Sequence, residues 1–130
     1  MSRTLISPDT LHPTPGFSHV AVATGRRLVF VAGQTALTRD FGLIAEGDLH
    51  GQTLAAMRNL EVALAAAGAG WDDVVRRTIY TTQPEAFAVI ADAISEATGG
   101  AADPPQTIAG VTGLALPGLL IEIEATAMME

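Results

Sequence analysis

Two acidic residues alternate with apolar ones near the end of the chain. Glu122 and Glu124 share one parity of residues 119–128 with Thr126, whereas the other parity holds Ile121, Ile123, Ala125 and Ala127. Such alternation indicates a β-strand, whose successive side chains point to opposite faces of the sheet. Alternate Cα atoms of a strand lie roughly 6.5 Å apart, so both carboxylates could serve one site. Their face is either solvated or a pocket in which a carboxylate positions a water or acts as a base.

Other residues capable of chemistry are few. Pro104-Pro105-Gln106-Thr107 opens a short predicted strand shortly before the two glutamates. Arg76 and Arg77 fall on opposite faces of an earlier predicted strand, so one of them could point into a cleft. Salt bridges to Glu or Asp are the expected use of these arginines. Three histidines have no metal-ligand spacing, so we expect no metal site: His12, His19 and His50.

Composition removes several classes of function. Lysine and cysteine are both absent, which excludes a Schiff-base lysine, a P-loop and a thiolate metal site. The formal net charge is −7 and no basic run occurs, so nucleic acid is not an expected partner. Charged residues make up only 16% of the chain, against about 25% in typical globular proteins. A small domain with so few charges is expected to bury surface in a homo-oligomer.

The chain has the length of one domain, residues 1–130. No apolar stretch resembles a signal peptide or a membrane span, so we expect a cytoplasmic protein with no membrane partner. Residues 1–16 are predicted to form an extended arm with loops. Hydrophobic periodicity then predicts strand, strand, helix, strand, helix, strand and strand, at residues 19–24, 28–32, 49–67, 74–82, 85–97, 106–111 and 119–128.

Two further expectations concern the first two of these strands. A turn at Gly25-Arg26 predicts that they form a hairpin. The second strand, residues 28–32, is continuously apolar, which predicts burial on both of its faces. The expected architecture is one sheet with two helices on one face.

Several stretches taken together resemble the RidA/YjgF family of imine and enamine deaminases, over residues 17–128. The most specific is Ile-Glu-Ile-Glu-Ala at residues 121–125, after a proline-containing turn; the others are Phe17-Ser18-His19-Val20-Ala21, the run of residues 28–34, residues 52–60 and Ala67-Gly68-Ala69. The resemblance implies a chorismate-mutase-like α+β fold that assembles as a trimer with a central barrel. It also implies small-molecule sites in the clefts between subunits, without a cofactor.

The family pattern maps onto this chain with substitutions. Glu122 matches the family's acidic residue and is the expected catalytic residue. Gln106 stands where active deaminases have an arginine that grips the substrate carboxylate, and Phe17 stands where a tyrosine is frequent. Ala32-Gly33-Gln34 matches a Ser-Gly-Gln run, with Gly33 allowing close backbone approach. The resemblance further implies a hydroxyl or backbone donor at Thr107 and a pocket wall at Ile108.

The loss of the arginine changes the expected ligand. An amide cannot reproduce the two charge-assisted bonds of an arginine to a carboxylate. We therefore expect a small neutral ligand and no ordinary 2-iminoacid deaminase activity. Two interpretations stay open: a hydrolase that cleaves an imine, enamine or related C–N bond with water held by Glu122, and a non-catalytic binding or regulatory trimer. The endoribonuclease activity sometimes attached to this family is disfavoured by the acidic charge balance.

Overall fold

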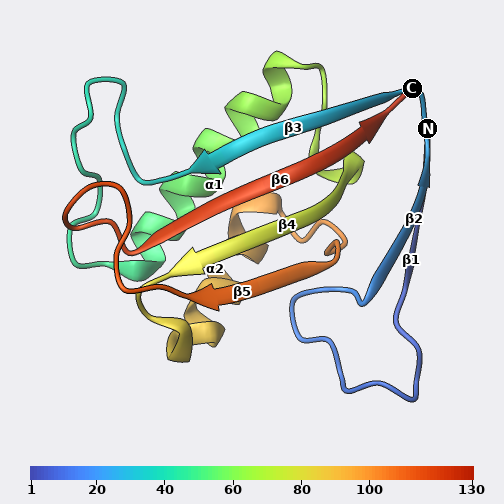
Figure 1. Cartoon of the computed structure of the whole chain (residues 1–130), viewed down its shortest axis with the longest axis horizontal. Coiled ribbons are helices and arrows are strands. Elements are labelled where there is room, and N and C mark those ends of the chain that lie inside the picture. The colour runs from blue at the N-terminus through green and yellow to red at the C-terminus, as the bar shows by residue number, and fades with distance from the viewer.

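In the computed structural model of the chain, which describes residues 1–130, four strands form the central sheet (Figure 1). Their order across the sheet is β3-β6-β4-β5. Strand β4 runs parallel to β5, and β6 runs antiparallel to both of its neighbours. Their bounds are β3 Arg27–Gln34, β4 Val74–Thr81, β5 Gln106–Gly110 and β6 Ile121–Met129.

Two helices cover one face of this sheet (Figure 1). Helix α1 (Leu49–Ala66) connects β3 to β4, and α2 (Phe87–Thr98) connects β4 to β5. Both crossovers join parallel strands and advance in the same direction across the sheet, so the right-handed crossover rule places both helices on the same side. The α+β class, with two helices packed on one face, is confirmed.

The helix boundaries follow from local chemistry. The Asp48 side chain caps α1 by accepting a hydrogen bond of 3.0 Å from the Gly51 amide. Helix α2 ends at Gly99, which has a left-handed φ of 68°. Its start lies later than predicted, because a 3₁₀ turn over Pro84–Ala86 precedes it. A second 3₁₀ turn, Trp71–Asp73, leads into β4.

The core lies between the helices and the sheet. Each helix buries an apolar stripe there, with Met57, Leu60 and Leu64 from α1 and Ile90 and Ile94 from α2. They meet Ile79 of β4 and the apolar parity of β6, whose members are also buried: Ile121, Ile123, Ala125 and Ala127. The alternation predicted for residues 119–128 is therefore confirmed, and Glu122 and Glu124 point to the opposite face.

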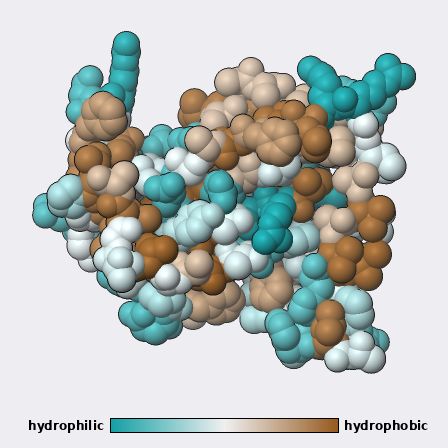
Figure 2. Space-filling view, in the orientation of Figure 1, coloured by the Kyte–Doolittle hydropathy of each residue, from teal (hydrophilic) through white to brown (hydrophobic).

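That opposite face carries no helix, and we call it the open face. The prediction that residues 28–32 are buried on both faces is wrong within a single chain. Leu28 and Phe30 of β3 are 54% and 75% exposed. Figure 2 looks onto the open face: hydrophobic surface lies along β3, and hydrophilic side chains lie nearer the middle of the sheet.

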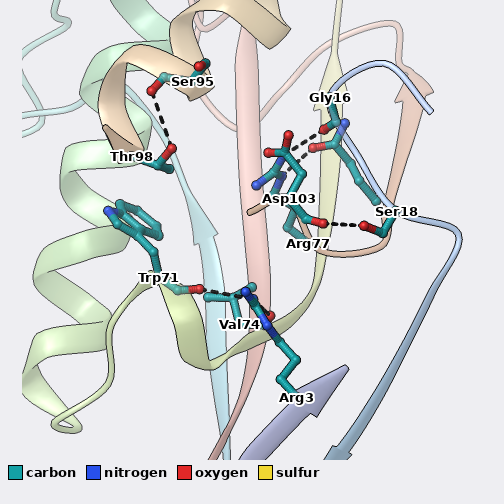
Figure 3. A network of polar contacts seen from close by, with 10 residues as sticks. Arg3, Gly16, Ser18, Trp71, Val74, Arg77, Ser95, Thr98 and Asp103 are labelled. Atoms are coloured by element: carbon teal, nitrogen blue, oxygen red, sulfur yellow. Dashed lines mark hydrogen bonds and ion pairs between the residues drawn. The ribbon is translucent and has the colours of Figure 1, made fainter. Parts of the chain in front are cut away.

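A separate two-stranded ribbon lies beside the sheet. Strand β1 (Ser2–Ile6) pairs antiparallel with β2 (Val20–Thr24). The predicted hairpin of residues 19–24 with residues 28–32 is therefore wrong, because β2 pairs with β1 and β3 pairs with β6. The predicted N-terminal arm contains strand β1. The buried side chain of Arg3 holds the ribbon against the sheet, because its Nη1 donates to the Val74 carbonyl at 2.7 Å and to the Trp71 carbonyl at 3.3 Å (Figure 3).

Candidate functional site

Glu122 lies near the start of β6, and buried polar groups fix that start. The side chain of Gln52, fully buried on α1, donates to the Gly118 carbonyl at 2.9 Å and accepts from the Leu120 amide at 2.8 Å. The Thr81 hydroxyl donates to the Leu120 carbonyl at 2.7 Å. Because buried polar groups are costly to leave unpaired, these bonds hold the chain two residues before Glu122 in one position.

The carboxylate of Glu122 lies against the backbone of Gly33. A Cβ atom at residue 33 would stand only 2.1 Å from Glu122 Oε2, far inside contact distance. No hydrogen bond or ion pair holds the Glu122 side chain in the structure, and the residue is only partly buried. This arrangement places an unpaired carboxylate on a glycine platform, where its oxygens can meet a water or a ligand.

Glu124 has a different environment on the same face. The Tyr80 hydroxyl donates to Glu124 Oε1 at 2.7 Å. Nearby, Arg76 Nη2 donates to the Thr107 hydroxyl at 2.8 Å. Arg76 is therefore a cation near Glu124, because both side chains line the same surface hollow. Glu122 has no ion-pair partner.

The hydrogen bond to Glu124 has a measurable consequence for Tyr80. That bond raises the pKa of Tyr80 above its ordinary value of 10.0, with smaller contributions from desolvation and from the charge of the two glutamates. Tyr80 is the only tyrosine, so ultraviolet absorbance of tyrosinate reports it alone. We expect a titration midpoint above 10.0 in the folded protein and a midpoint nearer 10.0 in the Glu124→Gln variant.

The raised pKa of Tyr80 also determines how its hydrogen bond to Glu124 contributes to stability at different pH values. A group whose folded-state pKa is raised contributes stability that is present below the unfolded-state pKa and lost as pH rises through the folded-state pKa. The Tyr80–Glu124 bond should therefore stabilise the fold below pH 10.0 and weaken above it. A midpoint that is the same in wild type and Glu124→Gln would show that the bond does not form in solution.

Gln106 lies on the other face of the sheet. It pairs in register with Arg77, whose side chain is buried on the helix-covered face. Arg77 Nε donates to Gln106 Oε1, and Arg77 Nη2 donates to the Gly16 carbonyl at 3.0 Å and to Asp103 Oδ1 at 2.9 Å (Figure 3). Burial lowers the pKa of Arg77, and the bond and charge of Asp103 oppose that effect.

The predicted site residues consequently fall into two groups within one chain. Glu122, Gly33 and the exposed Ala32 lie together at one end of β3 and β6. Gln106 pairs with Arg77 on β4, whereas Glu122 pairs with Tyr80. The two positions are therefore about 10 Å apart along β4, and Gln106 points to the opposite face of the sheet from Glu122. The remaining residues divide in the same way.

On the Gln106 side, Ile108 packs against the core. Phe17 lies in the loop between β1 and β2, edge-on to His19 with ring centroids 5.6 Å apart. Thr107 belongs to the open face through its bond to Arg76. A single chain therefore does not gather all of these residues in one pocket.

Sequence reasoning left open which of Arg76 and Arg77 faces a cleft. It missed Tyr80 as the partner of Glu124 and Gln52 as the residue that fixes the start of β6. The parity of residues 76, 78 and 80 does place Arg76 and Tyr80 on one face. The parity does not reveal which strand pairs with which, and that pairing brings them to Glu124.

The sequence model of a family described as Endoribonuclease L-PSP matches residues 8–129. The chain belongs to this family, the RidA/YjgF or Rid family. A RutC family protein of Pyrococcus horikoshii is 30% identical over 130 residues, covering 100% of both chains. Protein DfrA of Myxococcus xanthus is 32% identical, covering 98% of this chain and 97% of that protein.

Solved structures of the Rid family share the fold. YyfB of Yersinia pestis, a Rid protein of unknown function, superposes with a TM-score of 0.92 at 39% identity, over 99% of this chain and 100% of that chain. None of the helices is both long and apolar enough to cross a membrane. No group of three or more histidine, aspartate or glutamate side chains is arranged to hold a metal ion.

Proposed function

We propose that this Rid protein binds a small neutral metabolite between subunits of a homotrimer and hydrolyses an imine, enamine or related C–N bond with water held by Glu122. The observation that carries the proposal is the unpaired Glu122 carboxylate lying on Gly33. A carboxylate without a hydrogen-bond or ion-pair partner is free to accept a proton from water and orient the oxygen toward a C=N carbon.

The charges of the candidate site favour a neutral ligand. Glu122 has no cation paired with it, and residue 106 is an amide whose oxygen is already engaged by Arg77. A carboxylate-bearing substrate would meet the negative charge of Glu122 without the arginine clamp that such substrates require. Hydrolysis of a neutral imine needs only water, a base and a donor for the leaving amine.

The position of the site between subunits is supported by the open face. Leu28 and Phe30 of β3 expose apolar surface on this face, and Val20 and Val22 of β2 expose apolar surface on the ribbon beside the sheet. Exposed apolar patches of this kind are typical of subunit interfaces. The two groups of site residues lie on opposite faces of one sheet, so they can line one pocket only if different subunits contribute them. Light scattering of the intact protein should give the mass of a trimer, and a monomer at micromolar concentration would contradict this assembly.

Hydrolysis by Glu122 predicts a large effect of one isosteric change. In Glu122→Gln the general base is lost, so release of ammonia from freshly generated uncharged imines and enamines should fall about 10²- to 10⁴-fold. Glu61→Gln makes the same chemical change at an exposed position of α1 and should retain wild-type turnover. Equal rates for Glu122→Gln and wild type across the substrate panel would remove Glu122 from the mechanism.

A second candidate function is binding without turnover, in a regulatory trimer. The observation that favours it is the Arg77–Gln106 bond, which occupies the side chain at the position of the family's substrate-binding arginine. This alternative predicts that wild type and Glu122→Gln both bind an imine mimic and that neither releases ammonia. The same panel therefore separates the two candidates.

A further inference from the structure

Strands β2 and β3 each have an edge without a neighbouring strand in one chain. β3 pairs only with β6, and β2 pairs only with β1. Unpaired edges present backbone N–H and C=O groups that readily pair with another strand. Figure 1 shows that the β1–β2 ribbon runs away from β3 instead of lying along its free edge. Both edges are therefore open to other copies of the chain.

The connection between β2 and β3 prevents the two strands from pairing in one chain. It consists of Gly25 and Arg26, and two-residue hairpin loops need a positive φ at the first of these residues or at both. Neither residue has a positive φ. The Arg26 amide instead donates to the Met129 carbonyl at 2.8 Å, and a Cβ at residue 25 would stand 2.5 Å from that carbonyl oxygen. The connection is thus held against the end of β6 as an open corner.

The side chains beside the two free edges match each other. Val20 and Val22 of β2 and Leu28 and Phe30 of β3 are exposed and apolar. Each pair occupies one parity of its strand, so a register that pairs even-numbered residues with even-numbered residues places all four on one continuous face. The exposed positions of β1 include serine and threonine instead. The ribbon therefore offers β2 as the better partner for β3.

We propose that β2 of one subunit pairs antiparallel with the free edge of β3 in a neighbouring subunit, in a closed ring of three chains. The hairpin that the sequence favours for residues 19–24 and 28–32 then forms between chains and not within one. Short connections favour such an exchange of an element between protomers. The ring takes its three subunits from the trimer of the proposed function, on which this inference rests.

Within one chain, Phe17 is held beside the Gln106 group. The Ser18 amide donates to the Pro104 carbonyl at 3.2 Å, and the Ser18 hydroxyl donates to the Asp103 carbonyl at 2.7 Å. The chain therefore enters β2 from a point fixed next to the start of β5. Any subunit that gives its β2 to a neighbour brings Phe17 and Gln106 with it.

Antiparallel pairing carries this group to the other half of the candidate site. The residues that precede β2 then lie beside the end of β3, where Gly33 meets Glu122. Parallel pairing would carry them toward Arg27, at the far end of β3. In the exchanged ring, Phe17 of one subunit adds an uncharged wall to the Glu122 site of its neighbour. The site is incomplete in a single chain.

Disulfide trapping tests the exchange, because the wild-type chain contains no cysteine. Directly opposite residues of antiparallel strands have Cα atoms roughly 4.5–5.5 Å apart, which a disulfide can span. The registers that place Val22 opposite a large exposed residue of β3 pair it with Phe30 or with Leu28. After complete oxidation, Val22→Cys/Phe30→Cys or Val22→Cys/Leu28→Cys should migrate as a covalent trimer in non-reducing denaturing electrophoresis, because each chain gives one strand and receives another.

A matched pair of thiols provides the control. Val29 packs against the core and differs by one position from both Leu28 and Phe30, so its side chain points to the other face. Val22→Cys/Val29→Cys should therefore form no disulfide. A covalent monomer in which both thiols of a test pair are oxidised would show a hairpin within one chain and overturn the proposal. Free thiols in both test pairs after oxidation would also overturn it.

A charge on the shared apolar face gives a second measurement without a disulfide. Val22→Asp should reduce the mass measured by light scattering below that of a trimer, while circular dichroism shows a folded chain. Val62→Asp makes the same change on the exposed surface of α1 and should keep the wild-type mass. A Val22→Asp trimer as stable to dilution as wild type would contradict the exchange.

Strand exchange and hydrolysis fail separately in these experiments. A covalent trimer that releases no ammonia from the imine and enamine panel would leave the exchange standing and remove only the hydrolysis. An active trimer whose test pairs form disulfides within single chains would do the reverse.

Discussion

Replacement of Arg77 by methionine should lower the free energy of unfolding by about 3 kcal/mol, because breaking a buried ion pair costs about 3–5 kcal/mol. The side chain of Arg77 is only 5% exposed and joins three segments through Gly16, Asp103 and Gln106. Asp103 is 33% exposed, so water can partly solvate it after the change, which favours the low end of that range. Urea denaturation at one fixed protein concentration measures the effect, since the stability of an oligomer depends on concentration.

The neighbouring arginine provides the control. Arg76→Met makes the same substitution on the open face, where no ion pair is lost, and should alter the unfolding free energy by no more than about 0.5 kcal/mol. The double variant Arg77→Met/Asp103→Asn should recover part of the loss, because the unpaired carboxylate is gone. Similar stabilities for Arg77→Met and Arg76→Met would mean that the Arg77 cluster does not stabilise the fold.

Gly33→Ala should reduce turnover as strongly as loss of the Glu122 carboxylate while leaving the protein folded. The added Cβ would stand 2.1 Å from Glu122 Oε2 and 2.7 Å from Glu122 Cδ, so the carboxylate must move away from residue 33. A flexible glutamate side chain can rotate away, so we expect a stability loss of only about 1 kcal/mol. Ammonia release should fall by about 10²- to 10⁴-fold, to the level of Glu122→Gln, because the base is displaced.

Another glycine distinguishes steric displacement from a general effect of the added methyl group. A Cβ at Gly113 would meet nothing within 4 Å, so Gly113→Ala should keep both stability and turnover. In a Glu122→Gln background, Gly33→Ala should reduce turnover little further, because both changes remove the same base. Full activity of Gly33→Ala would show that Glu122 acts from a position other than the one on Gly33.

Local patterns in the sequence determined the secondary structure and the class of fold. Period-two alternation identified β6 and the face of Glu122, and helical spacing identified the buried stripes of α1 and α2. These predictions succeeded because alternation and helical spacing are properties of consecutive residues, which depend little on distant parts of the chain. The family pattern further singled out Gly33 and Glu122, which the fold places in contact.

Strand pairing was decided only by the tertiary structure. A turn at Gly25-Arg26 favoured a local hairpin, yet β2 pairs with β1 and β3 pairs with β6. Long-range pairing depends on which apolar faces can be covered together and on anchors such as Arg3, whose carbonyl partners are about 70 residues away. The same limit explains why the continuous apolar run of β3 did not reveal its exposed face.

Glu122 and Glu124 show this division most clearly. Their parity established that Glu122 and Glu124 share a face. Cross-strand register then gave them different surroundings, with Gly33 against Glu122, and Tyr80 and Arg76 beside Glu124. Sequence alone could name the acids, because alternation is local. Their partners come from strands that are distant in sequence, so only the folded sheet could give the two acids their different surroundings.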